Sequence, residues 1–108
     1  MRIALDFDDT YTRDPIFWEN FVGSAIRRGH DVRIVTFRSK EHNNSDLEEL
    51  LNGVNIKVIY TGAHKKRPYC AKIGWLPEVW IDDMPDLIVE DAYVPGELLA
   101  RQQSYDGE

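Results

Sequence analysis

Apolar residues follow one another along the chain in a pattern that predicts alternating strands and helices. Nearly continuous apolar runs stand at residues 2–7, 32–37, 56–60 and 79–81. Such runs are typical of strands that are buried on both faces, as in parallel sheets. Since parallel strands are joined by right-handed crossovers that usually contain a helix, we expect an α/β fold. In this fold a mainly parallel sheet lies between helices, as a three-layer α/β/α sandwich.

The first expected helix follows the first strand. Asp14 is suited to cap its amino end, and Pro15 stands at the first helical position, where the missing N–H costs nothing. Arg27 and Arg28 place positive charge at the carboxyl end of the helix dipole, and Gly29 can end the helix.

Two more helices are expected further along the chain. Ser45 followed by Glu48 matches a capping box that opens a second helix, with Leu47, Leu50 and Leu51 on its buried face. A short helix covers residues 66–73. Residues 87–94 can hold a helical turn and a last strand, between which periodicity does not decide.

Length and composition narrow the class of protein. The 108 residues make one domain, which we place at residues 1–95, followed by a tail at residues 96–108. The formal charge of -6 disfavours nucleic acid and acidic membranes as partners of the surface as a whole. Cys70 is the one cysteine, so no internal disulfide forms. No signal-peptide pattern and no apolar run near the ~20 residues of a membrane helix is found, so we expect a cytoplasmic protein without membrane contact.

Polar residues able to handle phosphate stand where the apolar runs end. Asp6 and Asp8 end the first run, Thr36 the second, and Asp82 and Asp83 follow the fourth. In a parallel sheet the carboxyl ends of the strands meet at one edge, where ligands bind. Residues two apart on an extended chain face the same side. We therefore expect Asp6 and Asp8 to address one site together.

Four carboxylates at one edge predict a bound cation. Close carboxylates repel one another and raise one another's pKa values unless a positive charge lies among them. A site of oxygen ligands with room for water and phosphate suits Mg²⁺ better than Ca²⁺. No His or Cys cluster has zinc spacing. The chemistry of such a site would be attack of an aspartate on phosphorus, with a second acid moving protons and a hydroxyl and a lysine holding the phosphoryl oxygens.

These residues resemble the four motifs of the haloacid dehalogenase superfamily. The motifs are Asp6-Phe7-Asp8-Asp9-Thr10, Ile34-Val35-Thr36, a lysine near residue 66, and Ile81-Asp82-Asp83. The resemblance spans about residues 2–86. It implies a Mg²⁺-dependent phosphatase that forms an aspartyl-phosphate, on a Rossmann-like fold. Asp6 would be the nucleophile, Asp8 the general acid and base, and Thr36 a phosphoryl ligand.

The same resemblance assigns the metal site and leaves two alternatives open. Mg²⁺ would be held by the Asp6 carboxylate, the Asp8 backbone carbonyl and the pair Asp82-Asp83, of which either acid can be the direct ligand. Lys66 is the expected phosphate-binding lysine, and Lys65 and Lys72 are the other candidates.

The substrate is less defined than the chemistry. We expect Asp9 and Thr10 to contact it, and Arg38, two residues past Thr36, to reach the leaving group, although Arg38 also suits a plain surface position. The motifs stand close together, which resembles the members of the family that carry no cap domain between them. A capless site is open, and it admits large substrates or uses a partner for closure. We therefore expect a substrate such as a nucleotide, a nucleic-acid end or another large phosphate ester, without a choice among them. The oligomeric state is not indicated.

Three other interpretations stay open. The run His64–Arg67 can track a nucleic-acid backbone, although a solvated loop is its more frequent meaning. A non-catalytic or partner-dependent binding module could keep the same fold. A phospho-acceptor signalling domain is disfavoured, because it would carry its acceptor aspartate after the third strand, where Tyr60, Thr61 and Gly62 stand.

Overall fold

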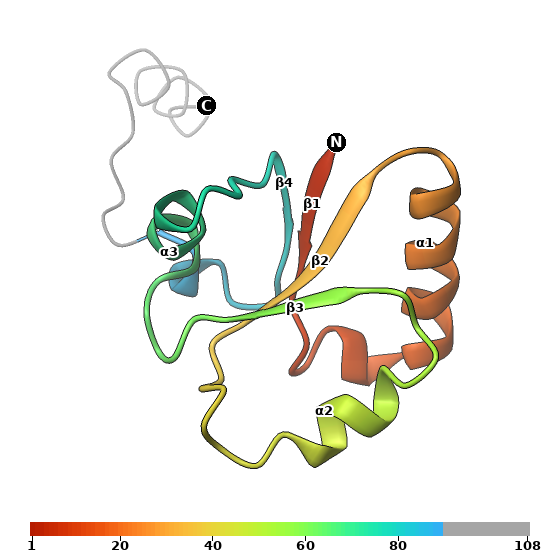
Figure 1. Cartoon of the computed structure of the whole chain (residues 1–108), viewed down its shortest axis with the longest axis horizontal. Helices are drawn as coiled ribbons and strands as arrows, with labels where there is room; N and C mark the ends of the chain where they lie inside the picture. Colours follow the sequence, from red (N-terminus) through yellow and green to blue (C-terminus); the bar gives the residue numbers. More distant parts are fainter. Residues whose placement is uncertain (90–108) are drawn as a thin grey trace, which may run out of the picture.

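A computed structural model describes residues 1–89 of the chain, and within them the expected strands form one parallel sheet (Figure 1). The strands are β1 (Arg2–Leu5), β2 (Asp31–Thr36), β3 (Lys57–Tyr60) and β4 (Val79–Ile81). Their order across the sheet is β3-β2-β1-β4, and all three pairings are parallel. The α/β class is therefore confirmed. The carboxyl ends of the two central strands, β1 and β2, lie side by side, as the site prediction requires.

Within residues 1–89, three α-helices and one short 3-10 helix connect the strands, and a second 3-10 helix follows β4. They are α1 (Pro15–Arg27), α2 (Ser45–Leu50), α3 (Lys66–Lys72), η1 (Tyr11–Arg13) and η2 (Pro85–Leu87). The expected turn at residues 87–94 is met in part by η2, which begins two residues earlier. The last strand expected there, and the tail at residues 96–108, lie outside the described residues.

The start of α1 agrees with the sequence pattern, whereas the start of α2 does not. The Asp14 carboxylate accepts a hydrogen bond from the Phe17 N–H at 3.2 Å, and Pro15 is the first helical residue. Ser45 is not the cap of α2, because Asn44 holds that position. The Asn44 amide donates to the carbonyls of Ser39 and His42, so it holds the preceding loop rather than the helix.

Each face of the sheet carries its own apolar cluster. Ile3, Leu5, Val32 and Ile34 pack with α1 and α2 on one face. Ala4, Val35 and Ile59 pack with Cys70 of α3 and with Trp75 on the other. Figure 1 shows α1 and α3 on opposite sides of the sheet. Alternate residues of each strand thus face different helices, which explains the continuous apolar runs.

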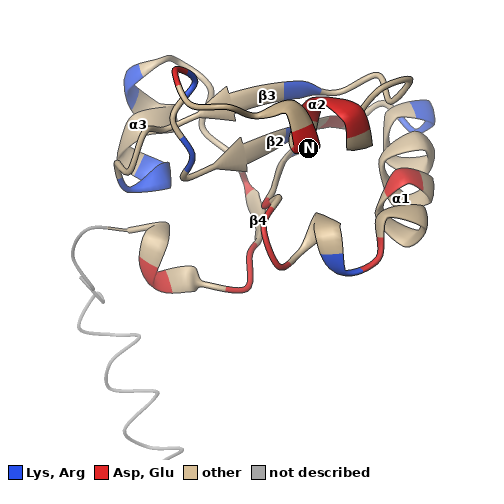
Figure 2. Ribbon diagram, turned by 90° about the horizontal axis from the view of Figure 1, so that it is seen from below, with Lys and Arg blue, Asp and Glu red and all other residues tan. Residues whose placement is uncertain are grey.

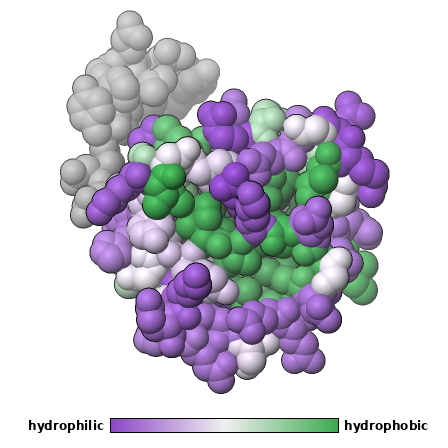
Figure 3. Space-filling model, viewed as in Figure 1, coloured by the Kyte–Doolittle hydropathy of each residue, from purple (hydrophilic) through white to green (hydrophobic). Residues whose placement is uncertain are grey.

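Not every expected core position is buried. Leu47 and Leu51 are buried in the first cluster, but Leu50 is 38% exposed, because α2 is short and turns this side chain outward. Figure 3 shows apolar residues gathered at the middle of the face seen in Figure 1, with hydrophilic residues around them. Within residues 1–89, no helix is long and apolar enough to cross a membrane.

Candidate active site

Asp6 stands one residue past β1, at the centre of the expected edge. Its backbone N–H donates to the Ile81 carbonyl at 2.9 Å, which extends the pairing of β1 with β4 and holds Asp6 beside the loop after β4. The residue is only 7% exposed. Its position in the chain, directly after the three buried residues that end β1, therefore explains its burial.

Both oxygens of the Asp6 carboxylate have a side-chain partner. The Lys66 ammonium donates to Oδ1 at 2.8 Å, and the Thr10 hydroxyl donates to Oδ2 at 3.1 Å. Thr10 is buried as well, and its hydroxyl lies 3.4 Å from Oδ1 of Asp83. Thr10 thus links the first motif to the loop after β4.

Lys66 is a buried cation between two acids. It is the first residue of α3, is 1% exposed, and also donates to Oδ2 of Asp82 at 2.5 Å. Lys65 instead donates to the backbone carbonyl of Asp86 at 2.7 Å. Of the candidate lysines, Lys66 is therefore the one that contacts the acidic group.

Asp6, Asp82 and Asp83 form a group that could bind a metal ion. Each offers one carboxylate oxygen, and these oxygens lie within 4.8 Å of one another. The ligand atoms are all carboxylate oxygens, which is the ligand type that hard cations prefer. Figure 2 shows acidic residues in the loop after β4 near those that follow β1. Both acids of the pair take part, so the choice between Asp82 and Asp83 as direct ligand stays open.

Burial governs the electrostatics of Asp6. Its pKa is raised from 3.8 to about 7, chiefly because burial disfavours the charged form. The hydrogen bond and charge of Lys66 lower this pKa, whereas Asp83 and Asp82 raise it. An acid with this pKa is about half protonated at neutral pH unless positive charge is added. A bound cation would supply that charge and favour the ionised form.

The Asp8 carboxylate lies apart from this group. Because β1 ends at Leu5 and the chain then turns, the two-residue alternation that was expected to bring Asp6 and Asp8 together does not extend to Asp8. The Arg38 guanidinium binds both of its oxygens, with Nη2 2.7 Å from Oδ1 and Nε 3.0 Å from Oδ2. Asp8 therefore faces Arg38 rather than the metal-binding acids.

Arg38 contacts three segments at the edge of the sheet where the strands have their carboxyl ends. It also binds Asp46, in the first turn of α2, through two bonds of 2.7 and 2.9 Å, and its guanidinium lies 5.1 Å from the centre of the Phe7 ring. The hydrogen bonds that Arg38 donates to Asp46 and Asp8 raise the pKa of Arg38, and those to Asp46 lower the pKa of Asp46 to about 2. Sequence reasoning missed Asp46, because nothing in its local pattern separates it from any acid in the first turn of a helix.

Thr36 ends β2 and is 1% exposed. Its hydroxyl accepts a hydrogen bond from the backbone N–H of Arg38 at 3.2 Å. Within residues 1–89, no hydrogen bond joins this hydroxyl to Asp6. Thr36 therefore sits at the expected edge of the sheet and next to the Arg38–Asp8 pair, and its contact with a phosphoryl group stays a prediction.

A hollow of about 360 Å³ adjoins the acidic group. Asp9, Thr10, Arg13 and Trp18 line it together with Asp82 and Asp83. Asp9 is exposed and has a left-handed backbone with a φ of 61°, which an aspartate tolerates better than most residues. The expected substrate residues Asp9 and Thr10 thus border open space beside the candidate metal ligands, whereas Arg38 does not line this hollow.

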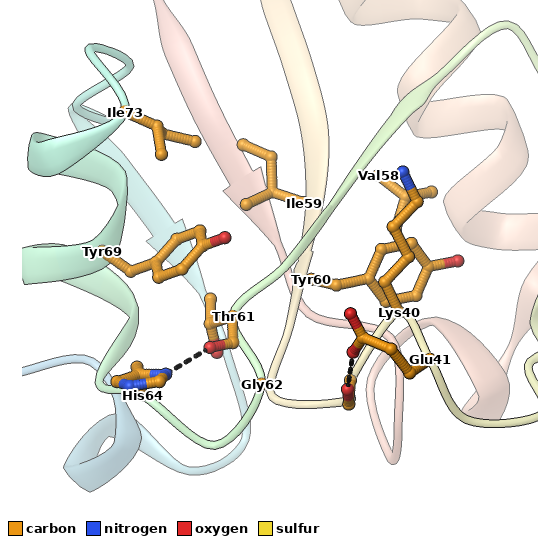
Figure 4. Close-up of a pocket in the computed structure, with 11 residues that line it drawn as sticks. Lys40, Glu41, Val58, Ile59, Tyr60, Thr61, Gly62, His64, Tyr69 and Ile73 are labelled. Carbon is orange, nitrogen blue, oxygen red and sulfur yellow. Dashed lines mark hydrogen bonds between the residues drawn. The ribbon is translucent and has the colours of Figure 1, made fainter.

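A larger hollow, of about 600 Å³, lies elsewhere, between β3 and α3 (Figure 4). Tyr60, His64, Tyr69 and Ile73 are among its walls, and the His64 ring bonds the Thr61 carbonyl at 2.8 Å. None of the residues expected from the sequence to act in catalysis lines it. Its size alone does not make it the reactive site, because Asp82 and Asp83 of the metal-binding group line the smaller hollow, and the buried Lys66 contacts Asp82.

Comparison of the chain with models of protein families, with curated proteins and with solved structures found no match. The function must therefore be argued from the geometry of the site.

Proposed function

We propose that this protein is a Mg²⁺-dependent phosphomonoester hydrolase of the haloacid dehalogenase superfamily, a capless member with a three-layer α/β/α core. One observation carries the proposal. Asp6, at the end of a central strand, is buried against Lys66 and Thr10 and shares a metal-binding group with Asp82 and Asp83. A nucleophile, a fixed cation and candidate metal ligands thus stand at one edge of a parallel sheet, where such folds bind ligands.

In the proposed reaction an oxygen of Asp6 attacks phosphorus, and the bond from phosphorus to the leaving oxygen breaks. Asp8 gives its proton to that oxygen. Water then attacks the phosphorus of the aspartyl-phosphate, Asp8 takes up a proton from the water, and inorganic phosphate leaves with Asp6 restored. Lys66 holds the Asp6 carboxylate in place and offers positive charge to the phosphoryl oxygens, and Thr36 offers them its hydroxyl.

The residues of the site fit a magnesium ion. The carboxylates of Asp6, Asp82 and Asp83 would hold it, with the backbone carbonyl of Asp8 as a further oxygen ligand that the family resemblance implies. When bound, Mg²⁺ neutralises charge that develops on the phosphoryl oxygens. Lys66 alone is one positive charge beside three carboxylates, so the protein itself leaves negative charge for a cation to balance.

An aryl phosphate with Mg²⁺ tests the proposal. Wild type should release the phenol, chelation of Mg²⁺ should stop the reaction, and Asp6→Asn should remove it. Asp31→Asn is the matched control, because Asp31 stands at the opposite end of the sheet, at the start of β2. Turnover that persists in Asp6→Asn at the wild-type rate would refute the assignment of the nucleophile.

The Arg38–Asp8 pair favours a second candidate, a module that acts only with a partner. An acid whose two oxygens both bind a guanidinium is not free to donate a proton, so a partner or substrate would have to draw Arg38 away. A panel of sugar phosphates, nucleotides and end-phosphorylated oligonucleotides separates the two. Failure on the whole panel together with activity in Arg38→Gln would favour the partner-dependent module. A stable phosphoryl adduct without turnover would instead indicate a signalling domain.

A further inference from the structure

The hollow beside the acidic group has one aromatic wall. Trp18, in the first turns of α1, lines it together with Asp82 and Asp83. A ligand whose phosphate is bound through a cation held by the acidic group would therefore extend along Trp18. None of the four motifs of the sequence includes this residue.

Neighbouring aromatic rings hold Trp18 in place. Its ring meets that of Phe17 edge to face at 4.8 Å and that of Phe21 at 5.6 Å, both at 81°. The Trp18 side chain is partly buried against the first apolar cluster, and its backbone N–H donates to the Asp14 carbonyl at 3.1 Å in the first turn of α1. Because the ring is fixed by its neighbours, it presents a flat surface at little cost in conformational entropy.

Arg13 adds a cation to the same hollow. It is the last residue of η1, is exposed, and forms no ion pair within residues 1–89. The exposed carboxylate of Asp9 lies on the wall as well. An aromatic face, a donor cation and an acceptor carboxylate are the groups that contact a nucleobase and its sugar hydroxyls.

We propose that this hollow takes the base and sugar of a nucleoside monophosphate, with the base stacked on Trp18. The proposal rests on the proposed function, because it makes the phosphate of that nucleotide the group that Asp6 attacks. The volume of about 360 Å³ is at the lower end of small-molecule sites, which suits a mononucleotide.

The charge of the protein favours a mononucleotide over a nucleic-acid strand. The net charge is -6, so a long polyanion is repelled. The basic run His64–Arg67 does not form a continuous cationic surface, because Lys66 points into the buried acidic group and Lys65 binds a backbone carbonyl. Few cations are therefore left near the site to hold further phosphates.

Binding of adenosine 5′-monophosphate and of glycerol 3-phosphate, both with Mg²⁺, tests the proposal. Equilibrium dialysis on the Asp6→Asn background measures binding without turnover. Trp18→Leu, which keeps apolar packing but removes the aromatic face, should weaken binding of the nucleotide about tenfold and leave glycerol phosphate within about twofold. Trp18→Phe should recover most of the loss. Tyr69→Leu, in the larger hollow, is the control and should change neither ligand.

The outcomes separate this proposal from the proposed function. Selective loss of nucleotide binding in Trp18→Leu supports the base site, even if no phosphomonoester is hydrolysed by the wild type. Equal loss of both ligands, or no loss of either, would overturn it, because a merely structural role for Trp18 makes no distinction between them. Selective loss of nucleotide binding in Tyr69→Leu would overturn the proposal as well, because it would show that the nucleotide binds in the larger hollow. Trp18-dependent binding of a 5′-phosphorylated oligonucleotide more tightly than the mononucleotide would also overturn the choice of substrate.

Discussion

Replacement of the buried Lys66 gives the most direct test of the charges at the site. Lys66→Met keeps the length and apolar stem of the side chain and removes its charge. In wild type the ammonium is 1% exposed and lies 2.8 Å from Asp6 and 2.5 Å from Asp82, so the variant leaves two acids facing each other without a cation. Removal of one partner from a buried ion pair lowers the free energy of unfolding by about 3–5 kcal/mol.

The expected loss for Lys66→Met is about 3 kcal/mol in the absence of divalent ions, at the lower end of that range. Asp6 limits the loss, because its raised pKa lets it take up a proton at small cost. Saturating Mg²⁺ should reduce the difference between variant and wild type, because a divalent cation among Asp6, Asp82 and Asp83 replaces the missing charge.

Urea unfolding followed by tryptophan fluorescence measures both effects, once with a chelator and once with Mg²⁺. Lys65→Met is the matched control, because within residues 1–89 the Lys65 ammonium binds the Asp86 carbonyl and forms no ion pair. We expect the stability of this variant to stay within about 0.5 kcal/mol of wild type. If Lys66→Met loses no more stability than Lys65→Met, the reasoning that places a necessary cation between the acids is refuted.

Three further predictions follow from burial and charge. The pKa of Asp6 is raised to about 7, so folded Asp6 binds its proton more tightly than Asp6 of the unfolded chain. The free energy of unfolding that this proton adds is full below pH ~4 and is lost as the pH rises through 7. Mg²⁺ competes with the proton, so calorimetric titration should find weaker Mg²⁺ binding at pH 5.5 than at pH 8, and equal affinity would contradict the assignment. The pKa of Asp46 is lowered to about 2, chiefly by its hydrogen bonds with Arg38. In Arg38→Gln the carbon-13 NMR titration midpoint of Asp46 should therefore return toward 3.8. An unchanged midpoint would exclude the Arg38–Asp46 ion pair in solution. Leu47 is 1% exposed, so Leu47→Ala should lower the free energy of unfolding in urea by about 2–5 kcal/mol. Leu50 is 38% exposed, so Leu50→Ala should lower it by less than about 1 kcal/mol. Equal losses would show that α2 presents a different face to the core.

Short-range patterns in the sequence determined the elements and the strand-end acids. A strand between two helical layers must be apolar on both faces, and the first polar residue after it must lie at the sheet edge, so Asp6, Thr36 and the pair Asp82-Asp83 could be placed from the apolar runs alone. Asp14 and Pro15 marked the start of α1 because a helix cap depends on neighbours in the chain.

Only the tertiary structure decided which side chains meet. Lys66 and Asp6 are 60 residues apart and Arg38 and Asp8 are 30 apart, and such contacts follow from the order of the strands, which periodicity does not encode. Because β1 ends at Leu5 and the chain then turns, Asp8 faces Arg38. Asn44 stands at the N-cap position expected for Ser45, while its amide donates to the preceding loop and makes no cap hydrogen bond. Trp18 reaches the acidic hollow for a similar reason: the fold brings the first turn of α1 beside Ile81, Asp82 and Asp83, which are more than 60 residues away in the chain.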